Sequence, residues 1–303
     1  HGFRVSDNSV DTNSTTPRLC VEFSAPINRG DPQIASYMKI DGGDQLEIEA
    51  EDSQLCAVGV EYGKRYHVTL RQGLPAKAPE DSLIKSVELD VYVRDRDPSV
   101  RFVGKSYVLP RIDKATIPVV SVNVDTIKAR VLRIGDRSLV TAIGEDRFLS
   151  QLDNWDADGI KDRSGTEVWT GTIAVKRDTN REVTTAVPVG ELVSKLEPGV
   201  YALVAKAEND KSDWGADATQ WFIVSNLGLA TMTGNDGLHV VVRSLTSAKA
   251  GGDIELKLLA LNNEILGTTK TDDKGYAHFD AGLIKGTGGM APSVLMASAA
   301  DGD

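Results

Sequence analysis

Apolar and polar residues alternate most regularly between Gly251 and Gly289. In residues 254–260, apolar side chains alternate with Glu255 and Lys257. Because successive side chains of a strand point to opposite faces, this pattern predicts a strand with one buried face.

Two reversals follow this strand. Asn262 and Asn263 tolerate positive φ, so the chain is expected to turn there into a second strand over residues 265–269. A further turn at residues 272–275 uses the conformational freedom of Gly275 and leads into a third strand over residues 276–281. Three short strands form a meander that needs a second sheet to cover its apolar face, which predicts a β-sandwich.

The N-terminal part of the chain follows the same plan. Residues 1–15 are rich in Asp, Asn, Ser and Thr and are expected to form a flexible lead-in. Strands are predicted from about Pro17, at intervals of 8 to 15 residues. Their expected ranges are 19–23, 37–40, 45–49, 55–60, 66–70 and 87–93. Four charged residues and Pro98 then interrupt the pattern, so a domain boundary is predicted after residue 97.

The middle segment contains most of the remaining strand patterns. Strands are predicted over 100–108, 119–124, 127–134, 167–175, 199–207 and 218–224. Between them, Leu139, Ile143, Phe148 and Leu152 have helical spacing, which predicts one or two short helices. Residues 226–236 are expected to be a turn into the third unit, which is expected to end at residues 294–297. The predicted fold is therefore all-β, with three tandem antiparallel β-sandwich domains over residues 1–97, 98–225 and 226–303.

Composition supports a soluble globular protein. At 303 residues the chain exceeds what one core usually supports, and no apolar run approaches the length of a membrane span. The net charge of −10, with 34 Lys and Arg dispersed among 44 acidic residues, argues against nucleic-acid binding. The chain begins with His1 instead of Met and has no apolar leader, so we interpret it as a processed or excised fragment.

The two cysteines are Cys20 and Cys56, each inside a strand-like run. A disulfide between them would close a loop of about 36 residues and stabilise the fold by roughly 3 to 4 kcal/mol. It would also indicate an oxidising compartment. The alternative is two buried free thiols that pack as small apolar groups.

Residues with catalytic or metal-binding chemistry are sparse. The histidines, His1, His67, His239 and His278, lie far apart in sequence without metal-ligand spacing, so His239 and His278 are interpreted as ordinary strand residues. No nucleophile or phosphate-binding motif is present in the sequence. We therefore predict no catalytic, cofactor or metal site.

Two stretches resemble binding sites only weakly. Asn154, Asp156 and Asp158 match the opening of a calcium loop, but Gly165 stands where a bidentate Glu is needed, so a solvated acidic turn is favoured. The tryptophans would suit a sugar-binding platform, yet their spread in sequence favours core and interface anchors. They are Trp155, Trp169, Trp214 and Trp221.

Several longer strings resemble the N-terminal part of bacterial alpha-2-macroglobulins. They include PRLCVEFSAPI, DVYVRDRDPSVRFVGKSYVLPR, LEPGVYALVAKAE, TQWFIVSNLGLATMTGNDGLHVVVRSLTSAKA and LLALNNEILGTTKTDDKGYAHFDAGLIKGTGGMAP. Members of this family are long envelope proteins of macroglobulin-like domains, with a protease-cleaved bait region and a Cys-x-x-Gln thioester. Phe23 and Gly59 stand three residues after the two cysteines, so neither cysteine belongs to a thioester motif. No bait segment is recognisable.

The resemblance implies a scaffold fragment of a periplasmic protease trap. Its parent would be anchored to the inner membrane through a lipidated N-terminus, with proteases as partners and a penicillin-binding protein as a further one. A tandem β-sandwich adhesin or carbohydrate-binding module is the alternative, and an enzyme is the least favoured class.

Overall fold

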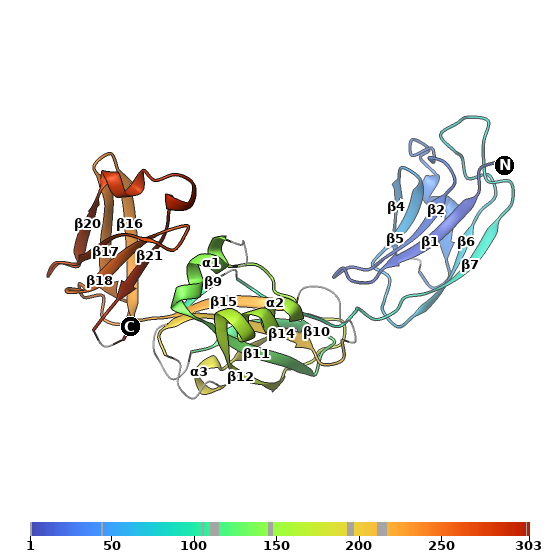
Figure 1. Cartoon of the computed structure of the whole chain (residues 1–303). Coiled ribbons are helices and arrows are strands. Elements are labelled where there is room, and N and C mark those ends of the chain that lie inside the picture. Colours follow the sequence, from blue (N-terminus) through green and yellow to red (C-terminus); the bar gives the residue numbers. More distant parts are fainter. Residues whose placement is uncertain are drawn as a thin grey trace. The chain divides into compact units, whose positions relative to one another are not determined.

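The computed structural model describes residues 2–43, 45–104, 106–109, 115–144, 148–192, 197–210, 217–300 and 302–303. Regular structure in these residues is mainly β-strand, with a few short helices, which confirms the predicted all-β fold (Figure 1). The chain separates into two compact units, His1–Pro98 with Arg177–Glu182, and Ser99–Lys176 with Val183–Asp303. The division into three domains ending at residues 97, 225 and 303 stays a prediction.

The first unit contains a β-sandwich of two antiparallel sheets. One sheet has the order β1 (Val5–Asp11), β2 (Arg18–Phe23), β5 (Gln54–Val58) and β4 (Glu47–Glu51). The other has the order β3 (Met38–Ile40), β6 (Arg65–Leu70) and β7 (Val87–Tyr92), and a 3-10 turn at Ile34–Tyr37 precedes β3. Leu19 and Leu55 from the first sheet and Val68 and Leu70 from the second are buried in the same core. Their alternation with exposed residues is the pattern that predicted most of these strands.

The expected flexible lead-in over residues 1–15 is wrong. Residues Val5–Asp11 form strand β1, which pairs with β2 from Val5 opposite Phe23 to Asp11 opposite Arg18. Just before it, Phe3 is 5% exposed and stacks on Phe23 with ring centroids 5.3 Å apart. The sequence pattern failed because β1 is an edge strand with mostly exposed side chains, so backbone hydrogen bonds and one aromatic anchor hold it.

Residues 94–97, where the alternation stops, are nevertheless tied down by polar groups of the same unit. Arg94 pairs with Asp97, and the side chain of Asn13 bonds both the backbone N–H and the carboxylate of Asp97 at 3.1 Å. From the segment Arg177–Glu182, Asn180 accepts a hydrogen bond from the Arg96 N–H at 2.9 Å and donates one to Asp95 at 2.8 Å. The end of the first predicted domain is therefore an ordered polar segment.

The second unit begins with another pair of sheets. A three-stranded sheet has the order β13 (Val183–Val187), β10 (Ile117–Val122) and β8 (Ser99–Phe102). A five-stranded sheet has the order β12 (Gly165–Ala174), β11 (Thr126–Ile134), β14 (Gly199–Ala207), β15 (Ala218–Val224) and β9 (Ser106–Leu109). Ile117, Val119, Val131, Leu203 and Phe222 are buried between the sheets.

Two details of this segment correct the prediction. The single strand expected over 100–108 is two strands, because β8 joins the three-stranded sheet and β9 joins the five-stranded one. Strand β9 also pairs parallel to β15, with Trp221 opposite Ser106, so this sheet is not wholly antiparallel. An apolar run alone cannot show that a strand leaves one sheet for another.

Helices cover the second face of the five-stranded sheet. Helix α1 (Leu139–Gly144), with a 3-10 turn at Asp136–Ser138, lies within the predicted helical segment, whereas α2 (Asn154–Gly159) and the π-helical turn Ile160–Ser164 were not predicted. Leu152, Ala157 and Ile160 pack against Leu132 and Trp221 of the sheet. Strands β14 and β15 are therefore covered on both faces, which explains their largely apolar sequences. The remaining helix, α3, is Val189–Leu192.

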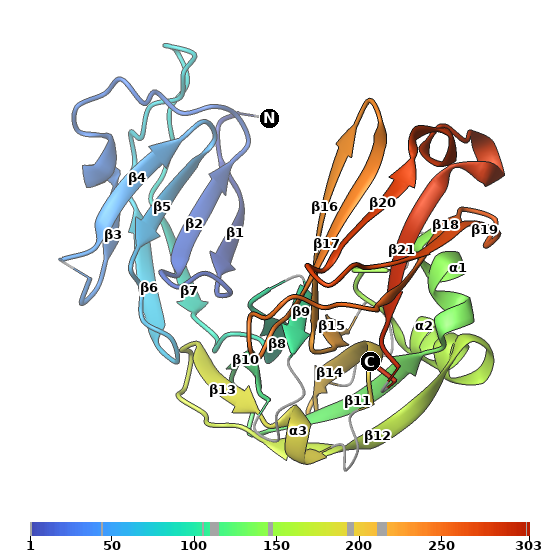
Figure 2. The same cartoon turned by 90° about the vertical axis from the view of Figure 1, so that its left-hand side faces the viewer.

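The C-terminal part forms a third sandwich. One sheet has the order β16 (Leu227–Gly234), β17 (Gly237–Ser244) and β20 (Tyr276–Asp280), whose strands lie side by side in Figure 2. The other has the order β19 (Ile265–Lys270), β18 (Glu255–Ala260) and β21 (Pro292–Ser298). Val240, Val242, Leu256, Leu258 and Phe279 fill the core between them. Short 3-10 turns at Ala281–Ile284 and Gly288–Met290 precede β21.

The hairpin predicted between residues 260 and 265 is confirmed, with Asn263 at a φ of 67°. The three-stranded meander is wrong, because β20 pairs with β17 in the opposite sheet. The turn expected over 226–236 is largely strand β16. Each of these differences follows from pairing between strands distant in sequence, which local periodicity does not encode.

Candidate functional site

The calcium-like sequence Asn154–Gly159 forms helix α2 and not a metal-binding loop. The carboxylate of Asp153 caps the helix by accepting the N–H of Asp156 at 2.8 Å. Because each helical residue turns by about 100°, Asp156 points away from the helix face that Asn154 and Asp158 share, so the three side chains do not converge as loop ligands would. The expected solvated turn is thus corrected to a capped helix.

Asp158 takes part in an ion-pair cluster instead. Arg130 on β11 contacts Asp158 at 2.9 Å and Glu167 on β12 at 2.6 Å, and Lys161 lies 3.5 Å from Glu167. Burial opposes the charge of Arg130, but its hydrogen bonds to Glu167 and Asp158 raise the pKa of the guanidinium above its usual value. The cluster fastens α2 to the five-stranded sheet, which is a structural role.

The described tryptophans lie in different environments. Trp221 is buried and donates its indole N–H to the carbonyl of Ser150 at 2.9 Å, whereas Trp155 on α2 is 85% exposed. Trp169 on β12 packs against the core between the sheets. Trp214 lies outside the described residues. A shared aromatic platform for sugars receives no support from these three side chains.

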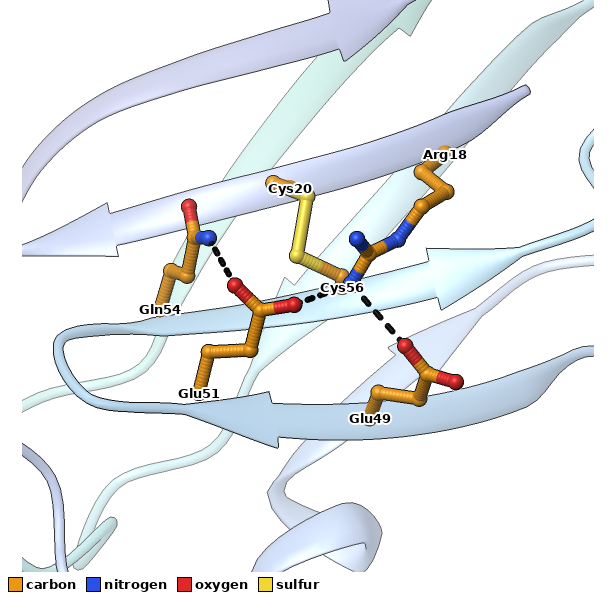
Figure 3. Close-up of a disulfide and its surroundings, with 6 residues drawn as sticks. All are labelled: Arg18, Cys20, Glu49, Glu51, Gln54 and Cys56. Atoms are coloured by element: carbon orange, nitrogen blue, oxygen red, sulfur yellow. Dashed lines mark hydrogen bonds and ion pairs between the residues drawn. A yellow bond between two sulfur atoms is a disulfide. The ribbon is translucent and has the colours of Figure 1, made fainter. Parts of the chain in front are cut away.

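The two cysteines form a disulfide. Cys20 on β2 lies directly opposite Cys56 on β5, with Cα atoms 4.0 Å apart (Figure 3). No free cysteine occurs in the described chain. Neither cysteine therefore offers a thiol for nucleophilic or thioester chemistry in this state.

A charged cluster lies beside the disulfide on the same sheet. Arg18 reaches Glu49 at 2.9 Å and Glu51 at 2.5 Å, and Gln54 donates to Glu51 at 2.6 Å (Figure 3). The hydrogen bond from Arg18 is the largest cause that lowers the pKa of Glu51. These side chains are partly exposed and mutually paired, so the cluster stabilises the sheet surface and leaves no unpaired base or acid.

The side chains best suited to hold a ligand are Asp236, His239 and His278. His239 on β17 and His278 on β20 are cross-strand partners with ring centroids 4.8 Å apart, and Asp236 lies in the turn between β16 and β17. Nε2 of His239 lies 3.1 Å from the Asp236 carboxylate, and Nε2 of His278 lies 3.2 Å from the Asp236 carbonyl oxygen. One ligand atom from each residue fits within 4.8 Å of the others.

The surroundings of this cluster are polar and partly exposed. Tyr276 places its hydroxyl 2.8 Å from Nδ1 of His239, and Asp280 places a carboxylate oxygen 3.8 Å from Nδ1 of His278. The hydrogen bond to His239 is the largest cause that lowers the pKa of Asp236. Both histidines lie on the solvent face, because Val240 and Phe279 next to them point into the core.

The sequence interpretation missed this cluster. It treated the histidines as separate strand residues, and the structure brings two of them together because β17 pairs with β20. His67 lies in the first unit beside Asp90, at 3.0 Å, and His1 lies outside the described residues. The available signal was that His239 and His278 each stand next to apolar residues of a strand, at a position whose side chain points away from the core.

Within the described part of the chain, no helix combines the length and the apolar character needed to cross a membrane.

Comparisons with known proteins identify related domains over most of the second unit. Residues 101–219 match the family described as Bacterial alpha-2 macroglobulin MG2 domain, and residues 224–303 match the Bacterial alpha-2-macroglobulin MG3 domain. An alpha-2-macroglobulin of Xylella fastidiosa (strain 9a5c) is 30% identical over 272 residues, 86% of this chain and 16% of the relative. One from Escherichia coli (strain K12) is 25% identical over 196 residues, 65% of this chain and 12% of the relative. The chain thus spans less than a fifth of the length of these relatives.

Solved structures share the fold. A Salmonella alpha-2-macroglobulin reacted with methylamine superposes with a TM-score of 0.63 at 21% identity, over 93% of this chain and 17% of that one. A native Escherichia coli alpha-2-macroglobulin fragment spanning domains MG0-NIE-MG1 gives a TM-score of 0.55 at 20% identity, over 92% of this chain and 90% of the fragment.

Proposed function

Because the chain belongs to the bacterial alpha-2-macroglobulin family, we propose that it is framework of a protease-trapping inhibitor of the cell envelope. The observation that carries the proposal is the match to two successive family domains over residues 101–219 and 224–303. The described residues of both regions form sheets around buried cores, the structure expected of a scaffold. In this proposal the chain is not an enzyme.

The capture chemistry is assigned to other parts of the parent protein. A thioester needs a cysteine thiol, and both cysteines of this chain are bonded to each other. Neither is followed by Gln at the third position, where Phe23 and Gly59 stand. The sandwiches would hold the bait region and the reactive domain in place, and proteases would bind the parent at those two parts.

We extend the proposal to the domain organisation. Three macroglobulin-like sandwiches over residues 1–97, 98–225 and 226–303 agree with the described core clusters, of which one lies in the first range, two in the second and one in the third. The Escherichia coli fragment with three named domains covers 92% of this chain, which supports the same division.

The proposed location is the periplasm. The disulfide between Cys20 and Cys56 supports it, because such bonds persist in oxidising compartments. In this proposal a lipidated N-terminus anchors the parent to the inner membrane. A penicillin-binding protein is a further proposed partner, without assignment to residues of this chain.

Protease capture tests this division of labour. This chain and its full-length parent are each incubated with trypsin in one sample and with methylamine in another. Covalent products are measured by denaturing electrophoresis and intact mass. We expect the parent to form a protease adduct and to react with methylamine, and this chain to do neither. A covalent protease adduct on this chain alone would refute the scaffold role.

A further inference from the structure

We propose that Asp236, His239 and His278 bind one divalent ion of the late first-row transition metals, for which Zn²⁺ is the probe. The site would lie on the exposed face of the β16-β17-β20 sheet, at the turn between β16 and β17. The inference is independent of protease trapping, because it rests only on the geometry of these side chains.

The donor atoms already lie near the spacing that a metal requires. In a tetrahedral zinc site, bonds of about 2.0 to 2.1 Å place neighbouring ligand atoms about 3.3 Å apart. Nε2 of His239 and the Asp236 carboxylate are 3.1 Å apart, and one donor atom from each of the three residues fits within 4.8 Å of the others. Small side-chain rotations therefore suffice to close the set around one ion.

Both imidazoles are oriented as metal ligands usually are. The Nε2 atoms of His239 and His278 face Asp236, and their Nδ1 atoms face the hydroxyl of Tyr276 and the carboxylate of Asp280, respectively. In metal sites the distal ring nitrogen commonly donates to such an oxygen, which fixes the tautomer and the ring orientation. Tyr276, at hydrogen-bond distance from His239, is accordingly a positioning residue, whereas the Asp280 carboxylate at 3.8 Å contributes only its charge beside His278.

The backbone under the site holds the two histidines in register and places no Cβ beside the donor atoms at the turn. His239 and His278 are held opposite each other by the β17–β20 ladder. The turn is closed by Gly234 opposite Gly237. A Cβ at Gly234 would lie 2.5 Å from the Asp236 carboxylate, and a Cβ at Gly237 would lie 2.8 Å from Nε2 of His278. Glycine at both positions keeps the space around the donor atoms clear.

The donor set selects the class of metal. Two imidazoles and one carboxylate suit Zn²⁺, Cu²⁺ or Ni²⁺, whereas Ca²⁺ and Mg²⁺ require six or more oxygen ligands. Water would complete the coordination, because the cluster is on the surface. A bound ion would join the β16–β17 turn to β20 and thereby stabilise the third sandwich.

Calorimetric titration of the untagged chain with Zn²⁺ is the first test. We expect one ion per chain at this site, no comparable binding of Ca²⁺ or Mg²⁺, and a higher midpoint of thermal unfolding with Zn²⁺. His239→Gln, His278→Gln and Asp236→Asn should each weaken binding at least about tenfold. His67→Gln is the matched control, since His67 is also a strand histidine beside carboxylates, and it should leave the affinity unchanged.

Two further measurements separate a built site from surface binding. The chain has four histidines, and NMR of their ring protons should show Zn²⁺ shifting the signals of His239 and His278 and not that of His67. Tyr276→Phe should weaken Zn²⁺ binding about tenfold while the metal-free stability stays unchanged. Absence of binding, or equal binding by the His239→Gln/His278→Gln double variant, would overturn the proposal.

Discussion

Cys20 lies opposite Cys56 in the β2–β5 ladder, and the bond between them encloses β3 and β4. Strand β3 belongs to the second sheet of the sandwich and β4 to the first. The disulfide therefore closes a loop that contributes to both layers around the N-terminal core.

Removing this disulfide should destabilise the first unit. On the chain-entropy account, a loop with a sequence separation of 36 residues restricts the unfolded state by about 3 to 4 kcal/mol. The Cys20→Ala/Cys56→Ala variant should lose about that much unfolding free energy, measured by denaturant titration under oxidising conditions.

The control for this variant is the redox state of the native chain. Reductant should lower the stability of the wild-type chain to near that of the variant and leave the variant unchanged. A loss below about 1 kcal/mol would contradict a stabilising disulfide.

Phe3 provides a test of whether the N-terminal residues are packed against the first sandwich and not a flexible lead-in. Its ring is buried and stacks on Phe23. Phe3→Ala should therefore lower the unfolding free energy by about 3 kcal/mol, as expected for an aromatic side chain removed from a core. Ser9→Ala, at an exposed position of the neighbouring strand β1, should change it by less than about 0.5 kcal/mol. Equal effects of the two substitutions would restore the interpretation of a flexible lead-in.

The parts of the fold that the sequence predicted are those where local pattern and packing agree. Strands β14 and β15 have the predicted bounds because their apolar runs are bounded by turn residues. Strand β1 and the split of residues 100–108 into β8 and β9 were missed. Edge pairing and sheet exchange depend on partners distant in sequence, and those partners leave no local periodicity.

Asp217 gives a pH-dependent prediction. Burial is the largest cause that raises the pKa of its carboxyl; Asp210 and Asp153 raise it further, and Lys206 and Arg130 oppose the shift. A raised pKa in the folded state means that protonated Asp217 favours folding. That contribution to stability is complete below the pKa of the unfolded state, about 3.9. It is lost as the pH rises through the higher pKa of the folded state.

Asp217→Asn should consequently be more stable than the wild type at pH 7. Because the group is partly solvated, we expect a gain of no more than about 1 kcal/mol. The gain should vanish below about pH 4, where wild-type Asp217 is protonated in both states. Denaturant titrations at several pH values measure this difference. Asp7→Asn, which removes an exposed charge from β1, is the control, and a gain that persists at low pH would exclude the proposed cause.

The candidate metal site was not predictable from spacing in the sequence. His239 and His278 are separated by the whole of β18 and β19, and only the pairing of β17 with β20 makes them neighbours. The calcium-like motif shows the opposite case. Asn154, Asp156 and Asp158 have suitable spacing in sequence, but Asp153 caps a helix there, and Asp156 points away from the face of the other two.

Gly275 should be intolerant of any side chain. It has a φ of +76°, and a Cβ at this position would lie 2.3 Å from the carbonyl oxygen of Val242. Gly275→Ala should destabilise the C-terminal sandwich by about 2 to 4 kcal/mol, because backbone strain and overpacking add. Gly282→Ala is the matched control, since a Cβ there meets no atom within 4 Å and its backbone has no left-handed requirement. Thermal and denaturant unfolding of the two variants should therefore differ clearly, and a Gly275→Ala variant as stable as Gly282→Ala would show that the turn between β19 and β20 relaxes at little cost.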